Sequence, residues 1–193
     1  VDLLLDKDGV FIFEEPYLGS MFEKTSYDQI YDEHIYMFSV SSVEKIFNLY
    51  DFVLVDVQKQ MTHGGSMRYI IKRKGSGAKS ENLKKYFEYE KNYKIDSKES
   101  SLLFKKNCEN SKRLINEKLK KFKLNGKKIC GYAATSKSTT ILNYCNIGPD
   151  IINYICDTTA EKINKFSPGM HIPIFDMKHF YNNQPDCIYL FAW

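Results

Sequence analysis

The segment at residues 27–39, with the sequence YDQIYDEHIYMFS, concentrates side chains that can transfer protons. It holds three tyrosines, three carboxylates and one histidine, which can serve as general acid, general base and orienting group near neutral pH. In a loop or in one helical turn, Tyr31 and His34 would share a face, and Glu33 can polarise a neighbouring imidazole or a substrate hydroxyl. The alternative is an aromatic loop packed over a sheet, in which His34 satisfies a backbone group.

A second candidate is the loop at residues 62–68, with the sequence THGGSMR. Paired glycines let a backbone approach a ligand closely, and His63, Ser66 and Arg68 supply polar contacts. A plain hairpin loop explains the two glycines equally well. Both interpretations stay open for this loop.

A third candidate is the stretch at residues 131–138, GYAATSKS, which follows a strand pattern and opens a helix pattern. Backbone N–H groups and the helix dipole hold phosphate at such a position. Ser136 stands where a Walker A loop has its second glycine, which argues against an NTPase. Small residues, hydroxyls and Lys137 suit the diphosphate of a nucleotide, and Asp157 follows the next strand, where such folds contact a ribose. A simple strand-to-helix turn is the alternative.

The elements that must position these residues begin with a strand pattern at 10–14, followed by a polar, aromatic stretch that ends at residue 39. A capping-box pattern at 41–44 opens a helix that reaches about residue 50. Two β-rich runs at 53–57 and 67–71 flank the glycine loop and predict an antiparallel pair. This order is how the sheet of a class I methyltransferase ends, although other α/β folds share it.

A basic Gly/Ser connector near residues 72–80 separates this region from the second half of the chain. Helix patterns follow at 81–94 and 98–124, and Asn125-Gly126 ends the second one. The remaining strand patterns are apolar and alternate with short helices, which indicates a parallel sheet covered on both faces. They lie at residues 129–134, 151–156, 171–174 and 187–191.

Composition excludes several function classes for this chain of 193 residues. The net charge of +4 is too small to indicate nucleic-acid binding by itself. No apolar run approaches the roughly 18 residues of a membrane span, so we expect no membrane contact and a cytoplasmic location. The cysteines form no CxxC pair, which favours buried free thiols in a reducing compartment over a metal site. They are Cys108, Cys130, Cys145, Cys156 and Cys187.

Six segments, in this order along the chain, together resemble the S-adenosylmethionine-dependent C-methyltransferases that act on nucleotide-activated 4-keto deoxysugars. They are EEPYLG at 14–19, FEKTSYDQIYDEH at 22–34, THGGSMR at 62–68, GYAATSKS at 131–138, LNYC at 142–145 and CDTT at 156–159. The resemblance implies an α/β protein in which the C-terminal end of a class I methyltransferase sheet precedes a Rossmann-like domain. The corresponding divisions are residues 1–74 for the methyltransferase part, 75–97 for a connector and helix, and 98–193 for the Rossmann-like nucleotide-sugar-binding domain.

The same resemblance implies roles for individual residues. His34 would be the base that removes the proton at C3 of the sugar, made acidic by the C4 ketone, and Tyr31 and Glu33 would line the pocket. The enolate would then attack the methyl group of S-adenosylmethionine, and a nucleotide-diphosphate sugar would be the substrate. The implied substrate-binding residues are His63, Gly64, Gly65, Ser66, Arg68, Gly131, Tyr132, Ala133, Thr135, Ser136, Lys137, Ser138 and Asp157.

The family's zinc-binding region and glycine-rich cofactor-binding half have no counterpart in this sequence, which suggests a fragment of a longer protein. We therefore expect the chain alone to bind S-adenosylmethionine weakly or not at all. The strand at 10–14 would then offer an unpaired sheet edge, through which a dimer could form. A non-catalytic nucleotide-sugar-binding module is the alternative function. An NAD-dependent oxidoreductase is a third, and the absence of a GxGxxG fingerprint counts against it.

Overall fold

The computed structural model describes residues 1–192, which form two compact units. Unit 1 comprises Val1–Ser26 and Tyr36–Lys105, whereas unit 2 comprises Tyr27–Ile35 and the chain from Lys106 onward. Residues 27–35 therefore belong to the same unit as the C-terminal half. The division expected from the sequence grouped them with residues 1–74, and it began the second domain at residue 98 instead of 106.

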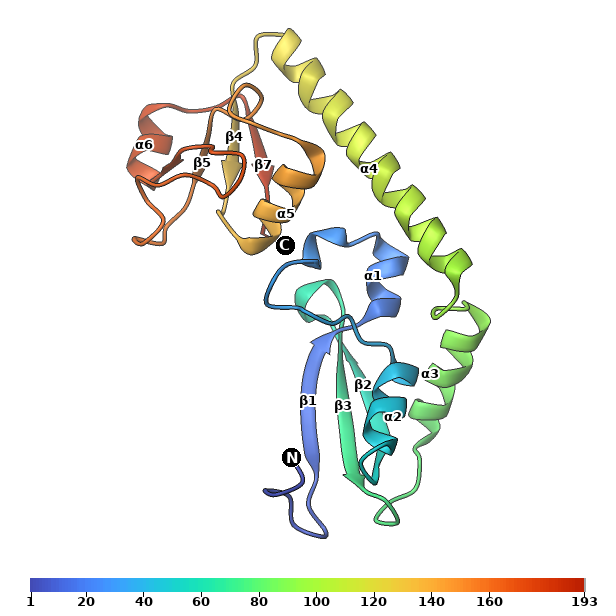
Figure 1. The fold of residues 1–193 in the computed structure, drawn as a ribbon. Coiled ribbons are helices and arrows are strands. Elements are labelled where there is room, and N and C mark those ends of the chain that lie inside the picture. The colour runs from blue at the N-terminus through green and yellow to red at the C-terminus, as the bar shows by residue number, and fades with distance from the viewer. Residues whose placement is uncertain (193) are drawn as a thin grey trace. The chain divides into compact units, whose positions relative to one another are not determined.

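Unit 1 contains a three-stranded sheet in the order β1-β3-β2, in which both neighbouring pairs are antiparallel (Figure 1). This confirms the antiparallel pair predicted on either side of the glycine loop. The elements are β1 (Phe11–Pro16), α1 (Leu18–Lys24), α2 (Val40–Asn48), β2 (Phe52–Gln60), the 3-10 turn η2 (Thr62–Gly64), β3 (Ser66–Arg73) and α3 (Glu81–Asn92). Helix α1 lies inside the polar, aromatic stretch before residue 39, where the sequence predicts no helix.

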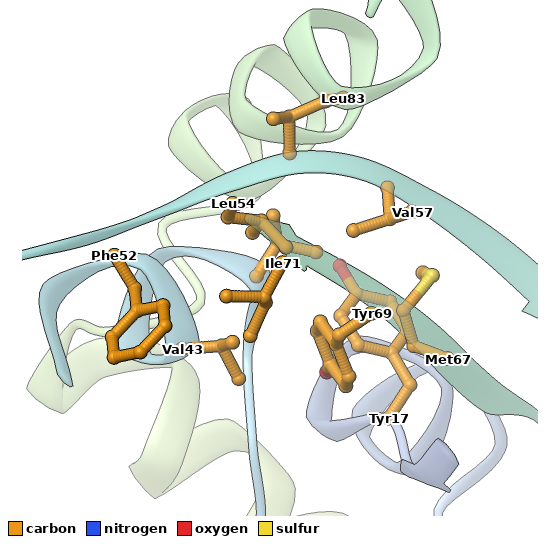
Figure 2. Packing of buried hydrophobic residues seen from close by; sticks show 10 residues of the cluster. Tyr17, Val43, Phe52, Leu54, Val57, Met67, Tyr69, Ile71 and Leu83 are labelled. Atoms are coloured by element: carbon orange, nitrogen blue, oxygen red, sulfur yellow. The ribbon is translucent and has the colours of Figure 1, made fainter. Parts of the chain in front are cut away.

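The core of unit 1 forms where α2 and α3 pack on β2. Figure 2 shows Leu83 of α3 beside β2, and side chains of β2 and β3 such as Leu54 and Tyr69 at the centre of the cluster. Each of these three residues is fully buried. Burying such side chains contributes about 1.5–3 kcal/mol each, so the core fixes the strands that flank the glycine loop.

The start of α2 differs from the predicted capping box at 41–44. Ser39 is the N-cap: its hydroxyl accepts a hydrogen bond from the Ser42 backbone N–H, and the Ser42 hydroxyl accepts one from the Ser39 backbone N–H. The buried Glu90 carboxylate also accepts bonds from the first two helical N–H groups, at 2.6 and 2.9 Å. Local sequence favours a helix N-cap at any Ser-x-x-Glu run. In the structure the cap lies two residues before the predicted one, and the Glu90 carboxylate bonds the first helical N–H group from 50 residues away in sequence.

Unit 2 is built on a parallel sheet of four strands in the order β6-β5-β4-β7, as the apolar strand patterns predicted. Together the two units are a mixed α/β structure. The elements of unit 2 are the 3-10 turn η1 (Tyr27–Gln29), β4 (Ile129–Tyr132), α5 (Ser136–Cys145), β5 (Tyr154–Cys156), β6 (Ile174–Phe175), α6 (Met177–Asn182) and β7 (Cys187–Leu190). Helix α4 (Lys98–Leu124) has the predicted bounds, and it begins in unit 1 and continues into unit 2.

The strand predicted at 171–174 is shorter and later than expected. His171 has a φ of 55°, in the left-handed region, and Pro173 has no N–H to donate to a neighbouring strand. Regular pairing therefore begins only at Ile174. The strand predicted at 151–156 likewise begins at Tyr154.

All five cysteines are free, and four of them are buried, as the sequence predicted. Burial raises the pKa of the Cys108 and Cys130 thiols to about 11, so both stay protonated and inert near neutral pH. Within residues 1–192, no three His, Cys, Asp or Glu side chains are grouped to hold a metal ion. In the same described part of the chain, no helix has the length and apolar character to cross a membrane.

Candidate functional site

The Tyr31 and His34 side chains form a pair in unit 2. Tyr31 Oη lies 3.0 Å from His34 Nε2, and the ring centroids are 4.7 Å apart, so the two residues share a face as their spacing predicts. Which atom donates the hydrogen bond depends on the tautomer of His34. Both side chains are half-buried, whereas Glu33 is exposed. With Nε2 bonded to Tyr31, a proton from a ligand would have to be accepted at Nδ1, which is buried.

Helix α5 anchors the segment that carries this pair. The Thr140 hydroxyl of α5 donates a hydrogen bond to the Ile30 carbonyl at 3.0 Å. The buried Tyr27 hydroxyl lies 3.3 Å from Ser111 Oγ of α4 and 3.6 Å from Cys145 Sγ at the end of α5. Burial raises the pKa of Tyr27, so this tyrosine acts as a neutral anchor. The segment has a fixed position on unit 2 although it is distant from α5 in sequence.

The turn that precedes α5 is tightly constrained. Gly131 has no room for a side chain, because a Cβ there would lie 2.7 Å from the Phe191 ring. Ala133 has a φ of 73°, a left-handed conformation that non-glycine residues rarely adopt. The next residue, Ala134, donates its backbone N–H to Asp157 Oδ2 at 2.6 Å. The chain thus leaves β4 through a strained turn that a neighbouring carboxylate holds.

Helix α5 then begins with a hydroxyl cap. Thr135 is the N-cap, and its hydroxyl accepts a hydrogen bond from the Ser138 backbone N–H at 3.1 Å. The Ser138 hydroxyl is buried and donates to the Thr135 carbonyl at 2.6 Å. Ser136 and Lys137, in the first turn, are half-buried. The predicted strand-turn-helix geometry is therefore present, and the positive end of the helix dipole lies at this turn.

A cavity of about 290 Å³ opens at this end of α5. Its volume lies just below the roughly 300–1,000 Å³ that is usual for small-molecule sites, so it suits a diphosphate better than a whole nucleotide sugar. Two lysines against one carboxylate, Glu161, together with several hydroxyls, favour an anion there. The residues that line it are Ala134, Thr135, Ser136, Ser138, Thr139, Glu161, Lys162, Lys165, Phe166, Ser167, Pro168 and Ile174.

Two other cavities have a different character. One of about 540 Å³ lies in unit 1 between β1 and α2, and aromatic side chains such as Phe13 and Phe47 line it. Another of about 400 Å³ lies in unit 2 between α4 and β7, and its lining includes Leu119 and Ile188. Both are mainly apolar, so neither offers the set of donors that a phosphate needs.

The glycine loop of unit 1 is closed by its own contacts. Gly65 has a φ of 129°, and a Cβ there would lie 2.6 Å from the Cβ and Oγ atoms of Ser20. Lys24 Nζ donates to the Gly64 carbonyl at 2.5 Å, and the Tyr17 backbone N–H donates to the Gly65 carbonyl at 3.1 Å. The two glycines therefore allow the loop to pack closely on α1. This agrees with the interpretation of the loop as a plain hairpin.

Ser66 and Arg68 also have partners within unit 1. Arg68 Nη2 lies 3.0 Å from Glu14 Oε2 across the β1–β3 ladder, and the Thr62 hydroxyl donates to the other oxygen of Glu14 at 2.7 Å. The Thr62 hydrogen bond is the largest effect on the pKa of Glu14; burial opposes it, and the hydrogen bond and charge of Arg68 add to it, so that the pKa is lowered. Ser66 is buried, and its hydroxyl donates to the Thr62 carbonyl. His63 is exposed.

The predicted residues thus fall into two groups. His34, Tyr31, Glu33, the turn at 131–138 and Asp157 lie in unit 2, and α5 connects the segment at 27–35 with the turn. His63, Gly64, Gly65, Ser66 and Arg68 lie in unit 1. The sequence assigns no role to Lys162 or Lys165, which line the cavity. Their signal was their position after β5, because parallel neighbours β4 and β5 end at the same edge of the sheet.

Comparison with known proteins gives two matches. Residues 61–193 match the model of a family described as the C-methyltransferase C-terminal domain. The chain is also 30% identical over 196 residues to C-methyltransferase NovU of Streptomyces niveus. That alignment covers 100% of this chain but 46% of the relative, so the chain spans less than half the length of the curated protein it matches.

Proposed function

Because this chain belongs to the C-methyltransferase C-terminal domain family, we propose that it is the sugar-nucleotide-binding part of an S-adenosylmethionine-dependent C-methyltransferase. In this proposal unit 1 is the end of a class I methyltransferase sheet, and unit 2 is a Rossmann-like domain. The substrate is a nucleotide-linked 4-keto deoxysugar that is methylated at C3. His34 removes the C3 proton, and the cavity at the start of α5 binds the diphosphate.

The observation that carries the proposal is the double contact of α5. Its first turn lines the polar cavity, and Thr140, one turn later, bonds the segment that holds the Tyr31–His34 pair. One rigid helix therefore fixes the spacing between a group that can remove a proton and a cavity that can hold a charged anchor. Removing a proton from a bound sugar is mainly a positioning problem, which such a helix helps to solve.

The proposed chemistry uses a ketone next to the proton that leaves. The C4 ketone acidifies the C3–H bond, and His34 accepts that proton, which leaves an enolate on the sugar. Tyr31, 3.0 Å from Nε2, orients the imidazole ring. General-base catalysis of this kind contributes about 10² to 10⁴ in rate. Because Glu33 is exposed, we assign it a contact with the substrate, in which its carboxylate accepts a hydrogen bond from a sugar hydroxyl.

S-adenosylmethionine supplies an electrophilic methyl group when it is bound. Among residues 1–192 no glycine-rich turn of the GxGxxG type is present, and β1 leads through Tyr17 directly into α1. The proposal therefore assigns to the described residues only substrate binding and proton removal.

The substitution His34→Asn tests the role of the base in a full-length protein that contains this chain. We expect the variant to keep its affinity for the sugar nucleotide, because asparagine retains polar contacts. Methyl transfer should stop, and exchange of the C3 proton with deuterated solvent should slow by about 10² or more. Exchange is read by NMR or mass spectrometry of the recovered sugar.

Exchange at the wild-type rate in His34→Asn would show that another residue, such as His63 or Tyr31, removes the proton. A wild-type protein that binds the sugar nucleotide but neither exchanges the proton nor transfers a methyl group would instead be a binding module.

A further inference from the structure

Asp157 follows β5 directly, and its carboxylate is engaged by backbone groups on both sides. Oδ2 accepts the Ala134 N–H at 2.6 Å, and Oδ1 accepts the Thr159 N–H at 2.8 Å. The residue is only 7% exposed. A buried carboxylate needs such charge-assisted bonds to offset the loss of water. Its two oxygens are therefore committed to the protein, whereas contact with a ribose was the sequence expectation for this residue.

The bond to Ala134 comes directly after the strained residue of the turn. Ala133 has a φ of 73°, and its own N–H is held by the Cys156 carbonyl at 2.8 Å. A left-handed alanine persists only where its surroundings fix it. Because Asp157 fixes the next N–H group, this carboxylate determines the path of the chain into α5 and thus the direction of the first turn of that helix.

The same carboxylate also faces a lysine that lines the cavity. Lys162 Nζ lies 3.8 Å from Asp157 Oδ2, and the lysine side chain is 41% exposed. An ammonium group has three N–H donors, so Lys162 can pair with Asp157 and still donate to a ligand. Lys162 lines the cavity together with Ser136 and Thr139 of α5. One buried group thus holds both the helix start and a cation at the cavity.

We propose that Asp157 is a positioning residue and that Lys162, which it holds at the cavity, binds the diphosphate of the ligand. The inference rests on the proposed function, because it takes the cavity to be the diphosphate site. It assigns the charge of that site to the loop after β5 in addition to the turn at 131–138. Asp157 acts on the ligand only through Ala134 and Lys162.

The first test measures binding of uridine diphosphate and thymidine diphosphate to the 193-residue chain by calorimetry. Lys162→Gln should raise the Kd about tenfold, because it removes one charge-assisted contact. Lys127→Gln is the matched control: Lys127 lies 3.1 Å from Asp186, whose other oxygen accepts the Lys128 N–H, but this pair does not line the cavity. The control should leave the Kd within about twofold of the wild type.

Asp157→Asn should also raise the Kd about tenfold. In the double variant Asp157→Asn/Lys162→Gln the increase should be smaller than the product of the two single effects, because one residue acts partly through the other. Asp186→Asn is the control for the removal of a carboxylate that bonds both a backbone N–H and a lysine. It should leave the Kd unchanged.

The second test needs no ligand. Hydrogen exchange at the amides of Ala134 and Thr135 should speed up at least tenfold in Asp157→Asn and stay unchanged in Lys162→Gln. Unchanged exchange in Asp157→Asn would overturn the positioning role. This readout also separates a local effect from general unfolding, because amides of β4 should keep their protection.

The outcomes distinguish this inference from the proposed function. If Lys137→Ala weakens binding but Lys162→Gln behaves like Lys127→Gln, the diphosphate site stands and the role of Lys162 is overturned. If the wild-type chain binds neither nucleotide, the diphosphate site and the role of Lys162 both fail. Amide exchange then still decides whether Asp157 positions the turn.

Discussion

The loop at residues 62–68 of unit 1 and the turn at residues 131–138 of unit 2 contain similar residue types, yet their polar groups are used differently. Both combine glycine, hydroxyl groups and one basic residue. In the loop, the glycine carbonyls, Ser66 and Arg68 are bonded within unit 1. In the turn, the hydroxyls of Thr135 and Ser138 are also bonded within unit 2, but several members border a polar cavity as well.

The difference shows which structural features favour a binding role over a structural one. A glycine is needed in both places for close approach, to Ser20 for Gly65 and to the Phe191 ring for Gly131. Neither glycine therefore indicates a ligand by itself. What favours the turn is the combination of a helix start, a cavity and lysines that come from a separate loop.

The largest expected effect is on stability, from Gly65→Ala. The substitution adds a Cβ that would lie 2.6 Å from Ser20 at a φ of 129°, so both strain and overpacking oppose it. Gly75→Ala is the matched control, because Gly75 has a φ of 88° but open space around it. A left-handed alanine costs about 1–2 kcal/mol, and overpacking adds about 1–3 kcal/mol.

Hydrogen exchange of the β2 and β3 amides measures these losses in unit 1 alone. Gly65→Ala should lower their opening free energy by more than Gly75→Ala does. Equal losses would mean that the loop does not need its close contact with α1, and the comparison between loop and turn would lose its basis.

A smaller effect is expected on ligand binding. Lys137 does not itself line the cavity, but it lies in the first turn of α5 between Ser136 and Ser138, which do. Lys137→Ala should weaken binding of a nucleoside diphosphate about tenfold, since a charge-assisted contact contributes about 1.5–3 kcal/mol. Arg68→Ala should change the Kd less than about twofold, because Arg68 is already paired with Glu14. Calorimetry on the 193-residue chain measures both values. A larger loss for Arg68→Ala than for Lys137→Ala would reverse the comparison.

The smallest effect is on the pH dependence of stability. Burial alone would raise the pKa of Asp157, but hydrogen bonds from Thr159 and Ala134 and the charge of Lys162 together lower it. A carboxyl group whose pKa is lower in the folded state stabilises the fold above its unfolded pKa of about 4. That contribution, on the order of 1 kcal/mol for bonds of this kind, is lost as the pH falls through the lower folded pKa.

Urea denaturation at several pH values between 5 and 2.5 measures this contribution. The unfolding free energy should decrease less steeply toward low pH in Asp157→Asn than in the wild type. Glu14→Gln in unit 1 should flatten the curve less, because the Glu14 side chain is 29% exposed and that of Asp157 is 7% exposed. A steeper curve in Asp157→Asn would contradict the assigned direction of the shift.

The sequence by itself determined most of the elements and the family. Helix α4 has the bounds that its periodicity predicts, and the four strands of unit 2 are parallel as their apolar character indicated. The spacing of Tyr31 and His34 predicted their contact. Each of these features depends on residues a few positions apart, or on one face of one element, so a local pattern carries the information.

The tertiary structure alone decided which segments share a unit and which polar groups face a cavity. Residues 27–35 belong with unit 2 because of two long-range hydrogen bonds. Thr140 bonds the Ile30 carbonyl and Tyr27 bonds Ser111, and each pair is more than 80 positions apart in sequence. Glu90 caps α2 from 50 positions away, and Lys162 joins the start of α5 through Asp157. Such contacts form when packing brings distant segments together. No local pattern in the sequence predicts them.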